Sequence, residues 1–322
     1  PRLAEGNPSQ TFHVEGPDHK FFVVVGYVRN GSPDTGYVFE VLVAGNPPRA
    51  LNALAKSISM DARSRDRGWL KAKLEAIAKV EGTAFDMAMP DGTLVRMPSE
   101  VAAFARLVLW QCEKLGTFTE ANLAKDTSLM DALMSNRRPK TTPDGGIAWY
   151  CDVHNPNTGD KFKVFVPELD LGNGRKRPYE VWFDGVFPLQ SFRGLAKSLS
   201  LDLQIRDIDW AVRKLHQLRT LQEVQGDFWA PIPGQEKSRV YPSTVAYVAE
   251  LILHRFKVLG LVNDRYEVGN STVVAFKGHD QEAGHQAPKL GMKDCAECGA
   301  KGSVKVDGGC ATCMSCSYSS CS

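Results

Sequence analysis

The segment Leu54-Ala-Lys-Ser-Ile-Ser-Met-Asp61 returns later in the chain as Leu195-Ala-Lys-Ser-Leu-Ser-Leu-Asp202. Matching residues continue on both sides of it, in the same order and with nearly the same spacing. These further matches are Glu40-Val41 with Glu180-Val181, Arg65-Asp66 with Arg206-Asp207, Trp69 with Trp210, Pro98-Ser99 with Pro242-Ser243, and Leu115-Gly116 with Leu259-Gly260. Self-similarity at a fixed offset indicates a repeated structural unit. The sequence therefore predicts a duplicated domain.

Each copy opens with segments typical of β-strands. They are rich in β-branched and aromatic residues, and they are separated by Gly, Pro, Asn and Asp, which favour turns. The predicted strands are residues 21–28 and 38–43 in the first copy, and residues 162–166 and 179–183 in the second.

After these strands, the spacing of the apolar residues changes to that of an amphipathic helix. Leu51, Leu54, Ala55 and Ile58 stand at positions i, i+3, i+4 and i+7, and residues 192–199 repeat the pattern. A second helix is predicted at residues 69–80 and 210–221, and a third follows each Pro-Ser pair. Ser99 and Ser243 are predicted N-caps of the third helix, and Gly116 and Gly260 suit its C-terminal end. Strands followed by helices indicate an α+β fold, in which helices pack on one face of a small antiparallel sheet.

The two copies offer few residues for catalysis. No Gly-rich phosphate loop, nucleophile elbow or His-Glu-x2-His motif is present in the sequence. The recurring Lys-Ser-x-Ser-x-Asp pattern is predicted to form the solvent-facing side of its helix, opposite the apolar side. Trp69 and Trp210 are predicted to lie in a core or an interface. Cys112 and Cys151 are predicted core residues.

Composition and charge narrow the function classes. The formal net charge of the 322 residues is +2, so no strong basic field points to nucleic acid as the main partner. No run of about 18 apolar residues is present that could span a membrane. No charged-then-apolar signal segment stands at the N-terminus. We therefore expect a cytoplasmic protein that does not enter membranes.

Six of the eight cysteines lie after residue 294. In a reducing compartment, clustered cysteines indicate metal binding or thiol exchange more often than structural disulfides. A Cys-x2-Cys pair turns tightly enough for both sulfurs to reach one ion, and a segment this short needs a metal to fold. The spacing predicts a C-terminal zinc ribbon.

Four thiolates complete a tetrahedral zinc site, so two of the six cysteines remain. In the assignment that we favour, Cys295, Cys298, Cys310 and Cys313 bind zinc, and Cys316 and Cys321 form a free dithiol. In a rival assignment, Cys313 and Cys316 are the second ligand pair, which leaves Cys310 and Cys321. In a third, all six cysteines bind metal or are spare.

The chain is thus expected to have four parts. Residues 1–134 are the first α+β repeat and residues 135–276 the second. Residues 277–292 are rich in Gly, His, Gln and Lys without apolar periodicity, and are predicted to be a flexible linker. Residues 293–322 are the cysteine-rich zinc ribbon with its redox tail. His279 and His285 of the linker are less favoured as ligands, because enough cysteines stand nearby.

The ending Gly309-Cys310-Ala-Thr-Cys313-Met-Ser-Cys316-Ser-Tyr318-Ser-Ser-Cys321 resembles the cysteine-rich C-terminus of adenosylcobalamin-dependent (class II) ribonucleotide reductases. Asn136-Arg-Arg-Pro139 and Pro178-Tyr-Glu-Val-Trp182 resemble the domain that precedes this terminus, which is sometimes a separate small subunit. The resemblance covers most of the second repeat and the tail, and it is diffuse over the first repeat. Met314 and Ser317 stand where the family commonly has Pro and Gly, which speaks against a ligand pair of Cys313 and Cys316.

The resemblance implies a role in electron delivery. In this family a cysteine pair on a mobile C-terminal tail reduces the disulfide that each turnover leaves in the active site, and thioredoxin or glutaredoxin reduces the pair again. By the resemblance, Cys316 and Cys321 are this shuttle. The catalytic barrel and the adenosylcobalamin site belong to a partner catalytic subunit. The chain is then an accessory C-terminal subunit or fragment of this oxidoreductase of deoxyribonucleotide biosynthesis, with no complete active site of its own.

Two readings from other classes remain open. One is a zinc-ribbon binding protein, for nucleic acid among other partners, in which every tail cysteine is structural. The near-neutral charge speaks against it, as does Tyr318 being the only aromatic residue of the ribbon. The other is a scaffold whose duplicated domain binds a partner through its sheet. The observation that would distinguish the reductase subunit from these two alternatives is a tail that cycles between dithiol and disulfide.

Overall fold

The computed structural model describes residues 6–29, 35–134, 146–185 and 190–268, together with three tail strands at 304–307, 310–313 and 319–321. The chain divides into two compact units, Pro1–Thr272 and Val273–Ser322. The first unit holds both repeats, and the second holds the cysteine-rich tail.

The first repeat combines a three-stranded antiparallel sheet, three long helices, and a two-stranded hairpin between the second and third helices. Two short helices then lead toward the second repeat. The elements are β1 (Ser9–Glu15), β2 (Lys20–Arg29), β3 (Gly36–Gly45), α1 (Leu51–Arg63), α2 (Arg67–Ile77), β4 (Phe85–Ala88), β5 (Leu94–Met97), α3 (Glu100–Lys114), α4 (Glu120–Leu123) and α5 (Ser128–Asp131).

The second repeat follows the same order, with its third strand in two pieces that both pair with β7. Its elements are β6 (Ile147–Asn155), β7 (Asp160–Asp170), β8 (Lys176–Pro178), β9 (Trp182–Gly185), α6 (Gln190–Leu203), α7 (Asp209–Leu218), β10 (Phe228–Pro231), β11 (Ser238–Tyr241) and α8 (Thr244–Val258). The tail unit is a three-stranded antiparallel sheet of β12 (Val304–Asp307), β13 (Cys310–Cys313) and β14 (Ser319–Cys321).

The predicted α+β fold is confirmed, because every strand pair is antiparallel and long helices follow the strands in each repeat. The prediction of one continuous strand at residues 179–183 is wrong. The sheet pairing stops at Pro178 and resumes at Trp182. Between them, the Ser200 hydroxyl accepts from the Val181 amide at 3.0 Å and donates to the Val181 carbonyl at 3.2 Å, so a helix side chain satisfies the strand backbone there.

Both predicted N-caps are confirmed. The Ser99 hydroxyl accepts from the Ala102 amide, and the Ser243 hydroxyl accepts from the Ala246 amide, each at 3.0 Å. Gly116 and Gly260 follow the last turns of α3 and α8 with φ of +66° and +71°. This left-handed conformation strains residues with a Cβ atom, which is why glycine ends these helices.

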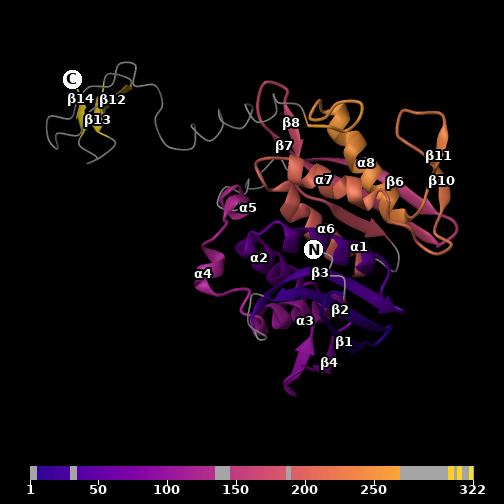
Figure 1. Ribbon diagram of the computed structural model, residues 1–322. Coiled ribbons are helices and arrows are strands. Elements are labelled where there is room, and N and C mark those ends of the chain that lie inside the picture. Colours follow the sequence, from indigo (N-terminus) through magenta and orange to yellow (C-terminus); the bar gives the residue numbers. More distant parts are fainter. Residues whose placement is uncertain are drawn as a thin grey trace. The chain divides into compact units, whose positions relative to one another are not determined.

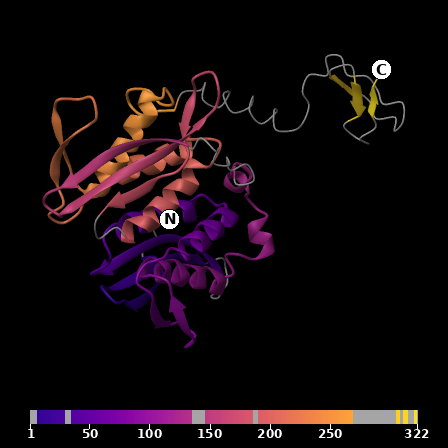
Figure 2. The ribbon, with the colours of Figure 1, turned by 180° about the vertical axis from the view of Figure 1, so that it is seen from behind.

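The helices of the two repeats face each other. α1 packs against α6 and α7, and α6 packs also against α2 and α3. Figures 1 and 2 show α1 and α6 in the middle of this unit, with the sheet of each repeat on the outer side. Phe21, Val23 and Val25 of β2 point into the first core, whereas Phe22 is 42% exposed on the outer face of the sheet. Among the described helices, none is both long and apolar enough to cross a bilayer.

Gly194 sets how closely α6 approaches the first repeat. A Cβ atom at this position would lie 2.5 Å from Cγ1 of Val101 on α3 and 3.0 Å from Cδ2 of Leu54 on α1. Both neighbours are buried core residues, so neither has room to move aside. The helix backbone, rather than a side chain, therefore makes the contact at this point.

We expect Gly194→Ala to lower the free energy of unfolding by about 1–3 kcal/mol, the usual range for overpacking a core. Alanine normally stabilises a helix interior by about 0.5–1 kcal/mol relative to glycine, so the sign of the effect reports the close packing. Urea denaturation of the full chain would measure it. A stabilised variant would show that the repeats do not pack this tightly at Gly194.

Candidate functional site

The serines and aspartates of the recurring pattern are buried in both repeats, so the prediction of a solvent-facing side is wrong for them, whereas Lys197 is exposed as predicted. Ser57, Ser59 and Asp61 of α1 are at most 4% exposed, and Ser198 and Asp202 of α6 are completely buried. The apolar period correctly identified the side that packs on the repeat's own sheet. The opposite side is covered by the other repeat, and the period of a single helix contains no information about that contact.

A cluster of four charged residues lies at the centre of this contact. Lys214 Nζ is 2.5 Å from Asp61 Oδ1, and Lys73 Nζ is 2.6 Å from Asp202 Oδ1, so each lysine binds the aspartate of the other repeat. Each also lies near the aspartate of its own repeat, at 3.0 Å for Lys214 and 3.2 Å for Lys73. All four side chains are 0% exposed. We call these residues the charge quartet.

The recurring tryptophans and serines complete the quartet. Indole Nε1 of Trp69 donates to Asp61 at 2.7 Å, and that of Trp210 donates to Asp202 at 3.1 Å. Each lysine lies 5.2 Å from the ring centroid of the tryptophan in its own repeat. The Ser57 and Ser198 hydroxyls meet across the interface at 3.0 Å. Exchanging the two copies reproduces the whole arrangement, as in the interface of a two-fold symmetric dimer.

The two halves of the quartet differ in electrostatics. Burial raises the pKa of Asp61, but Lys214 and Lys73 outweigh it and the pKa ends below its ordinary value. For Asp202 burial prevails over the lysines, and the pKa is raised. Burial likewise prevails at Lys73 and lowers its pKa to about 8. We regard Asp61–Lys214 as the more firmly ionised pair, because the Trp69 hydrogen bond to Asp61 is shorter than the Trp210 bond to Asp202.

The quartet can hold the repeats together but cannot act on a substrate. Two ammonium and two carboxylate groups balance to zero net charge. None of the four side chains reaches solvent, so no reactant can approach them. Oδ2 of Asp61 and Oδ2 of Asp202 accept no hydrogen bond, although the former is 3.2 Å from the Lys73 ammonium. Such a cluster favours one arrangement of the repeats, because a shift between them breaks the two closer pairs and leaves each lysine only the aspartate of its own repeat.

Replacing one lysine tests this role. Lys73→Met leaves the carboxylate of Asp202 buried with one cation fewer, so we expect the free energy of unfolding to fall by about 3–5 kcal/mol. Urea denaturation of the full chain would measure the change.

Two further variants are needed to interpret the change in unfolding free energy of Lys73→Met. The double variant Lys73→Met with Asp202→Leu removes one charge of each sign and should recover part of the loss. Lys71→Met, which alters a half-buried lysine of the same helix, should stay within about 0.5 kcal/mol of the parent. A loss below about 1 kcal/mol for Lys73→Met would contradict the assignment.

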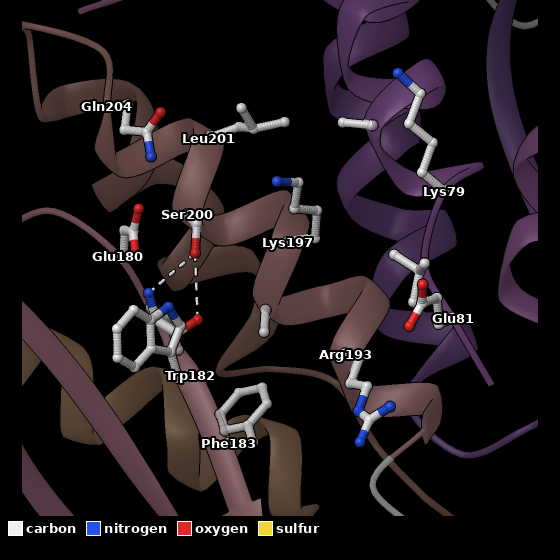
Figure 3. Close-up of a pocket in the computed structure, with 14 residues that line it drawn as sticks. Lys79, Glu81, Glu180, Trp182, Phe183, Arg193, Lys197, Ser200, Leu201 and Gln204 are labelled. Atoms are coloured by element: carbon white, nitrogen blue, oxygen red, sulfur yellow. Dashed lines mark hydrogen bonds between the residues drawn. The ribbon is translucent and has the colours of Figure 1, made fainter. Parts of the chain in front are cut away.

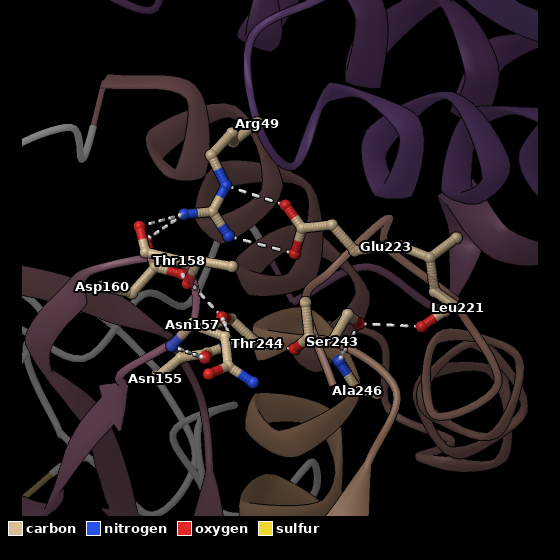
Figure 4. A network of polar contacts seen from close by, with 11 residues as sticks. Arg49, Asn155, Asn157, Thr158, Asp160, Leu221, Glu223, Ser243, Thr244 and Ala246 are labelled. Atoms are coloured by element: carbon tan, nitrogen blue, oxygen red, sulfur yellow. Dashed lines mark hydrogen bonds and ion pairs between the residues drawn. The ribbon is translucent and has the colours of Figure 1, made fainter. Parts of the chain in front are cut away.

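A second polar cluster joins the repeats on one side only (Figure 4). Arg49, just before α1, donates from Nε and Nη2 to the two oxygens of Glu223 at 2.7 and 3.0 Å. Its Nη1 lies 2.5 Å from Oδ1 of Asp160, a carboxylate whose side chain is 1% exposed. Burial lowers the pKa of Arg49, but Glu223 and Asp160 together raise it above its ordinary value. Arg49 uses four of its five N–H donors on protein acceptors, two on Glu223 and one each on Asp160 and the Thr158 carbonyl.

We expect a double-mutant cycle of Arg49→Met and Glu223→Gln to give a coupling energy of about 1–3 kcal/mol, because the pair is bidentate and part-buried. The control is the exposed pair of Arg213 and Asp209, which lie 2.5 Å apart on α7. Its coupling should be about 0.3–0.5 kcal/mol. Equal coupling in both cycles would show that Arg49 does not join the repeats.

The predicted zinc and redox residues all belong to the tail unit. Cys310 and Cys313 form the two ends of β13, and Cys321 ends β14. Cys295, Cys298, Cys316, the two histidines His279 and His285, and the linker at 277–292 lie outside the described residues. In the part of the chain whose side chains are described, no group of three or more His, Cys, Asp and Glu is arranged to hold a metal ion.

The strand register brings one predicted ligand opposite one predicted redox residue. Cys310 of β13 is the antiparallel partner of Cys321 of β14. Cα atoms of such partners are about 4.5–5.5 Å apart, which lies within the range of about 4.4–6.8 Å that a disulfide spans. Cys310 and Cys313 lie in one extended strand, where residues three apart are separated by roughly 10 Å. A Cys-x2-Cys ligand pair needs a tighter turn than this.

The two cysteines of the repeats are not exchange candidates. Cys112 is completely buried, which raises the pKa of its thiol to about 12. Its predicted place in the core is confirmed. Cys151 is half-buried against the second core, and burial raises its pKa as well. Trp69 and Trp210 lie at the interface, as predicted. The sequence prediction missed Lys73 and Lys214, although they recur in step with the tryptophans.

Comparisons with protein-family models, with curated proteins and with solved structures give no match to this chain.

Proposed function

We propose that this chain is an accessory, electron-delivering part of an adenosylcobalamin-dependent ribonucleotide reductase of the cytoplasm. The partner is the catalytic subunit, which carries the cobalamin, and thioredoxin or glutaredoxin supplies the electrons. The observation that carries the proposal is the gathering of six cysteines in one small unit apart from the repeats, with Cys310 opposite Cys321 across a strand pair. The resemblance of this cysteine pattern to the family supplies the reaction.

The proposed exchange is a two-electron transfer between one dithiol and one disulfide. A tail thiolate attacks a sulfur of the partner's disulfide and forms a mixed disulfide, releasing one partner thiolate. The second tail thiolate then attacks the tail sulfur of the mixed disulfide. The tail ends as a disulfide, and both partner cysteines end as thiols after taking up the two protons that the tail thiols lost. The dithiol of the reductant protein reverses the change in the tail.

Two cysteine pairs can serve as the shuttle. The family resemblance assigns Cys316 and Cys321. The strand register supports Cys310 and Cys321 instead, because these two residues are Cα partners in an antiparallel pair and because Cys310 lies in one extended strand with Cys313. In the second case, zinc would take Cys313 and Cys316 beside Cys295 and Cys298. The function is the same in both cases.

The tail's donor set suits zinc. Thiolates are preferred zinc ligands, and zinc has no redox chemistry of its own, so it would stabilise the fold of the tail while the remaining pair exchanges electrons. The repeats would then provide the surface that docks to the catalytic subunit. The charge quartet buried in their interface supports a fixed arrangement of the two repeats, as a scaffold needs.

The test is native mass spectrometry of the full chain, reduced and then mildly oxidised, with disulfide mapping. We expect one zinc in both states and one reversible disulfide that reduced thioredoxin removes. If the shuttle is Cys310 and Cys321, Cys310→Ser abolishes the disulfide and keeps the zinc, whereas Cys316→Ser loses the zinc. If it is Cys316 and Cys321, the two variants exchange their effects.

The control is Cys151→Ser, which should change neither zinc nor disulfide, because this cysteine lies in the second repeat. A tail in which no reversible disulfide forms would overturn the proposal in favour of a structural zinc ribbon. Full reductase activity in the presence of the catalytic subunit, with Cys310, Cys316 and Cys321 all changed to Ser, would overturn it as well.

A further inference from the structure

Two grooves of comparable size in the repeats differ in charge. The groove between α2, α6 and β9 has a volume of about 680 Å³, and two acids, Glu81 and Glu180, stand among its three cations. Figure 3 shows Lys79 and Glu81 on the α2 side of this groove and Lys197 and Arg193 on α6. The second groove lies beside the C-terminal end of α1 and has a volume of about 560 Å³. Four cations and one acid line it, and we call it the basic groove.

The basic groove belongs to the first repeat. Its lining comes from β3, from the end of α1 and the turn into α2, and from α4 and the residues after it. The cations are Arg63, Arg65, Arg67 and Lys125, and the acid is Asp126. Arg63 is already in use, because it forms an ion pair with Glu40 at 3.2 Å and donates to a carbonyl of β3. Three cations therefore remain beside one carboxylate.

Arg67 is a buried guanidinium that uses few of its donors. It is 8% exposed, yet the described part of the chain gives it one hydrogen bond, from Nη1 to the Ala62 carbonyl at 2.6 Å, and no ion pair. Four of its five N–H donors are therefore left. Burial lowers the pKa of Arg67, and the charge of Arg65 lowers it as well. Buried charges in proteins are normally paired, so we expect the anion for Arg67 to come from outside the chain.

The second repeat shows how a guanidinium at the same place is satisfied within the chain. Arg177 of β8 lies at the corresponding end of α6. It donates to three backbone carbonyls, those of Leu203, Ile205 and Arg206. Leu203 corresponds to Ala62, because the first helices of the repeats match at a fixed offset. One guanidinium thus stands at this helix end in each repeat, with three backbone acceptors in the second and one in the first.

Arg65 adds a second cation, held in a strained conformation. It is exposed, and within the described residues it forms neither a hydrogen bond nor an ion pair. Its φ is +71°, and it stands two residues after Arg63, the last residue of α1. Glycine is the usual residue at such a left-handed position after a helix, because a Cβ atom there costs stability. Strain of this kind is typical of residues that are kept for a function.

The other polar residues of the groove indicate which anion fits. One hydrogen bond to a neighbouring amide oxygen, at 2.9 Å, leaves the Lys125 ammonium two further donors. Hydrogen bonds from Ser128 lower the pKa of Asp126, and the charges of Arg65 and Arg67 lower it further. An ionised Asp126 repels a phosphate dianion more strongly than a single carboxylate, and it can accept from a peptide N–H. The volume also exceeds that of a lone carboxylate, so the ligand carries its carboxylates on a longer chain.

We propose that the basic groove docks an acidic segment of a partner protein. One carboxylate of the segment binds the guanidinium fork of Arg67 through two hydrogen bonds, and a second lies between Arg65 and Lys125. Arginine clusters recognise acidic motifs in this way. The groove lies wholly within the first repeat and does not depend on electron transfer by the tail, so this proposal and the electron-delivery proposal can fail separately.

The test is isothermal titration of the full chain with hexaglutamate, with hexaglutamine and with inorganic phosphate. We expect hexaglutamate to bind with a Kd below about 1 mM and more weakly as salt is raised, and hexaglutamine not to bind. Arg67→Met should weaken hexaglutamate binding about ten-fold or more. Arg67→Lys keeps the charge but loses the fork, and should weaken it about three-fold or more. Tighter binding of phosphate than of hexaglutamate would overturn the proposal.

Arg65→Gly separates binding from folding. It removes a cation from the groove and also the strain at a positive φ, so we expect hexaglutamate to bind about three-fold more weakly while the urea midpoint of unfolding rises. The matched control is Arg106→Met, which removes the charge of an exposed arginine of α3 outside the groove and should leave hexaglutamate binding unaltered. Equal effects of Arg65→Gly and Arg106→Met on binding, or no hexaglutamate binding at about 1 mM, would show that the basic groove is not the site.

Discussion

The contact between the repeats depends on four charges that neither solvent nor ligand can reach. Lys73 and Lys214 each bind the aspartate of the opposite repeat, and the four side chains balance to zero charge. A buried ion pair is weak support for stability, because desolvation costs about as much as the attraction returns. What the buried ion pairs contribute is the specificity of the contact between the repeats. Sliding α1 along α6 by one turn would separate Lys214 from Asp61 and Lys73 from Asp202, the two pairs that join the repeats, whereas a purely apolar contact would tolerate such a shift.

The duplicated halves then diverged around this symmetric centre. Arg49 joins Asp160 and Glu223, and the first repeat has glycine, Gly82, where the second has Glu223. Lys56 ties the end of α7 through the Gln217 carbonyl and the Thr220 hydroxyl, and Lys79 stands at the position of Thr220 in the other repeat. One side of the interface thus carries the polar contacts of Arg49 and Lys56.

Sequence reasoning reached the long helices and part of each sheet, but it missed β1, the hairpins β4-β5 and β10-β11, and the contacts that connect the repeats. The predicted strands, the three long helices and the caps at Ser99 and Ser243 followed from local patterns, because each pattern describes the residue's own element. The burial of Ser57 and Asp61 did not follow, since it is imposed by the other repeat. A signal was present: Lys73 and Lys214 recur in step with Asp61 and Asp202, and charged residues that recur together suggest mutual pairing. The break between Pro178 and Trp182 escaped as well, and the Ser200 hydrogen bond does not account for it, because Ser59 binds Val41 in the same way within the continuous strand β3.

The cysteines of the repeats differ from those of the tail in how suitable they are for thiol exchange. Thiol exchange needs an accessible thiolate, and burial raises the pKa of both Cys112 and Cys151, the two cysteines of the repeats. The charge quartet is sealed from solvent. The other cysteines of the chain belong to the tail, where Cys310 and Cys321 are partners in the strand register. Cα atoms of such partners lie within the separation that a disulfide spans, and a pair that is oxidised and reduced repeatedly needs this separation.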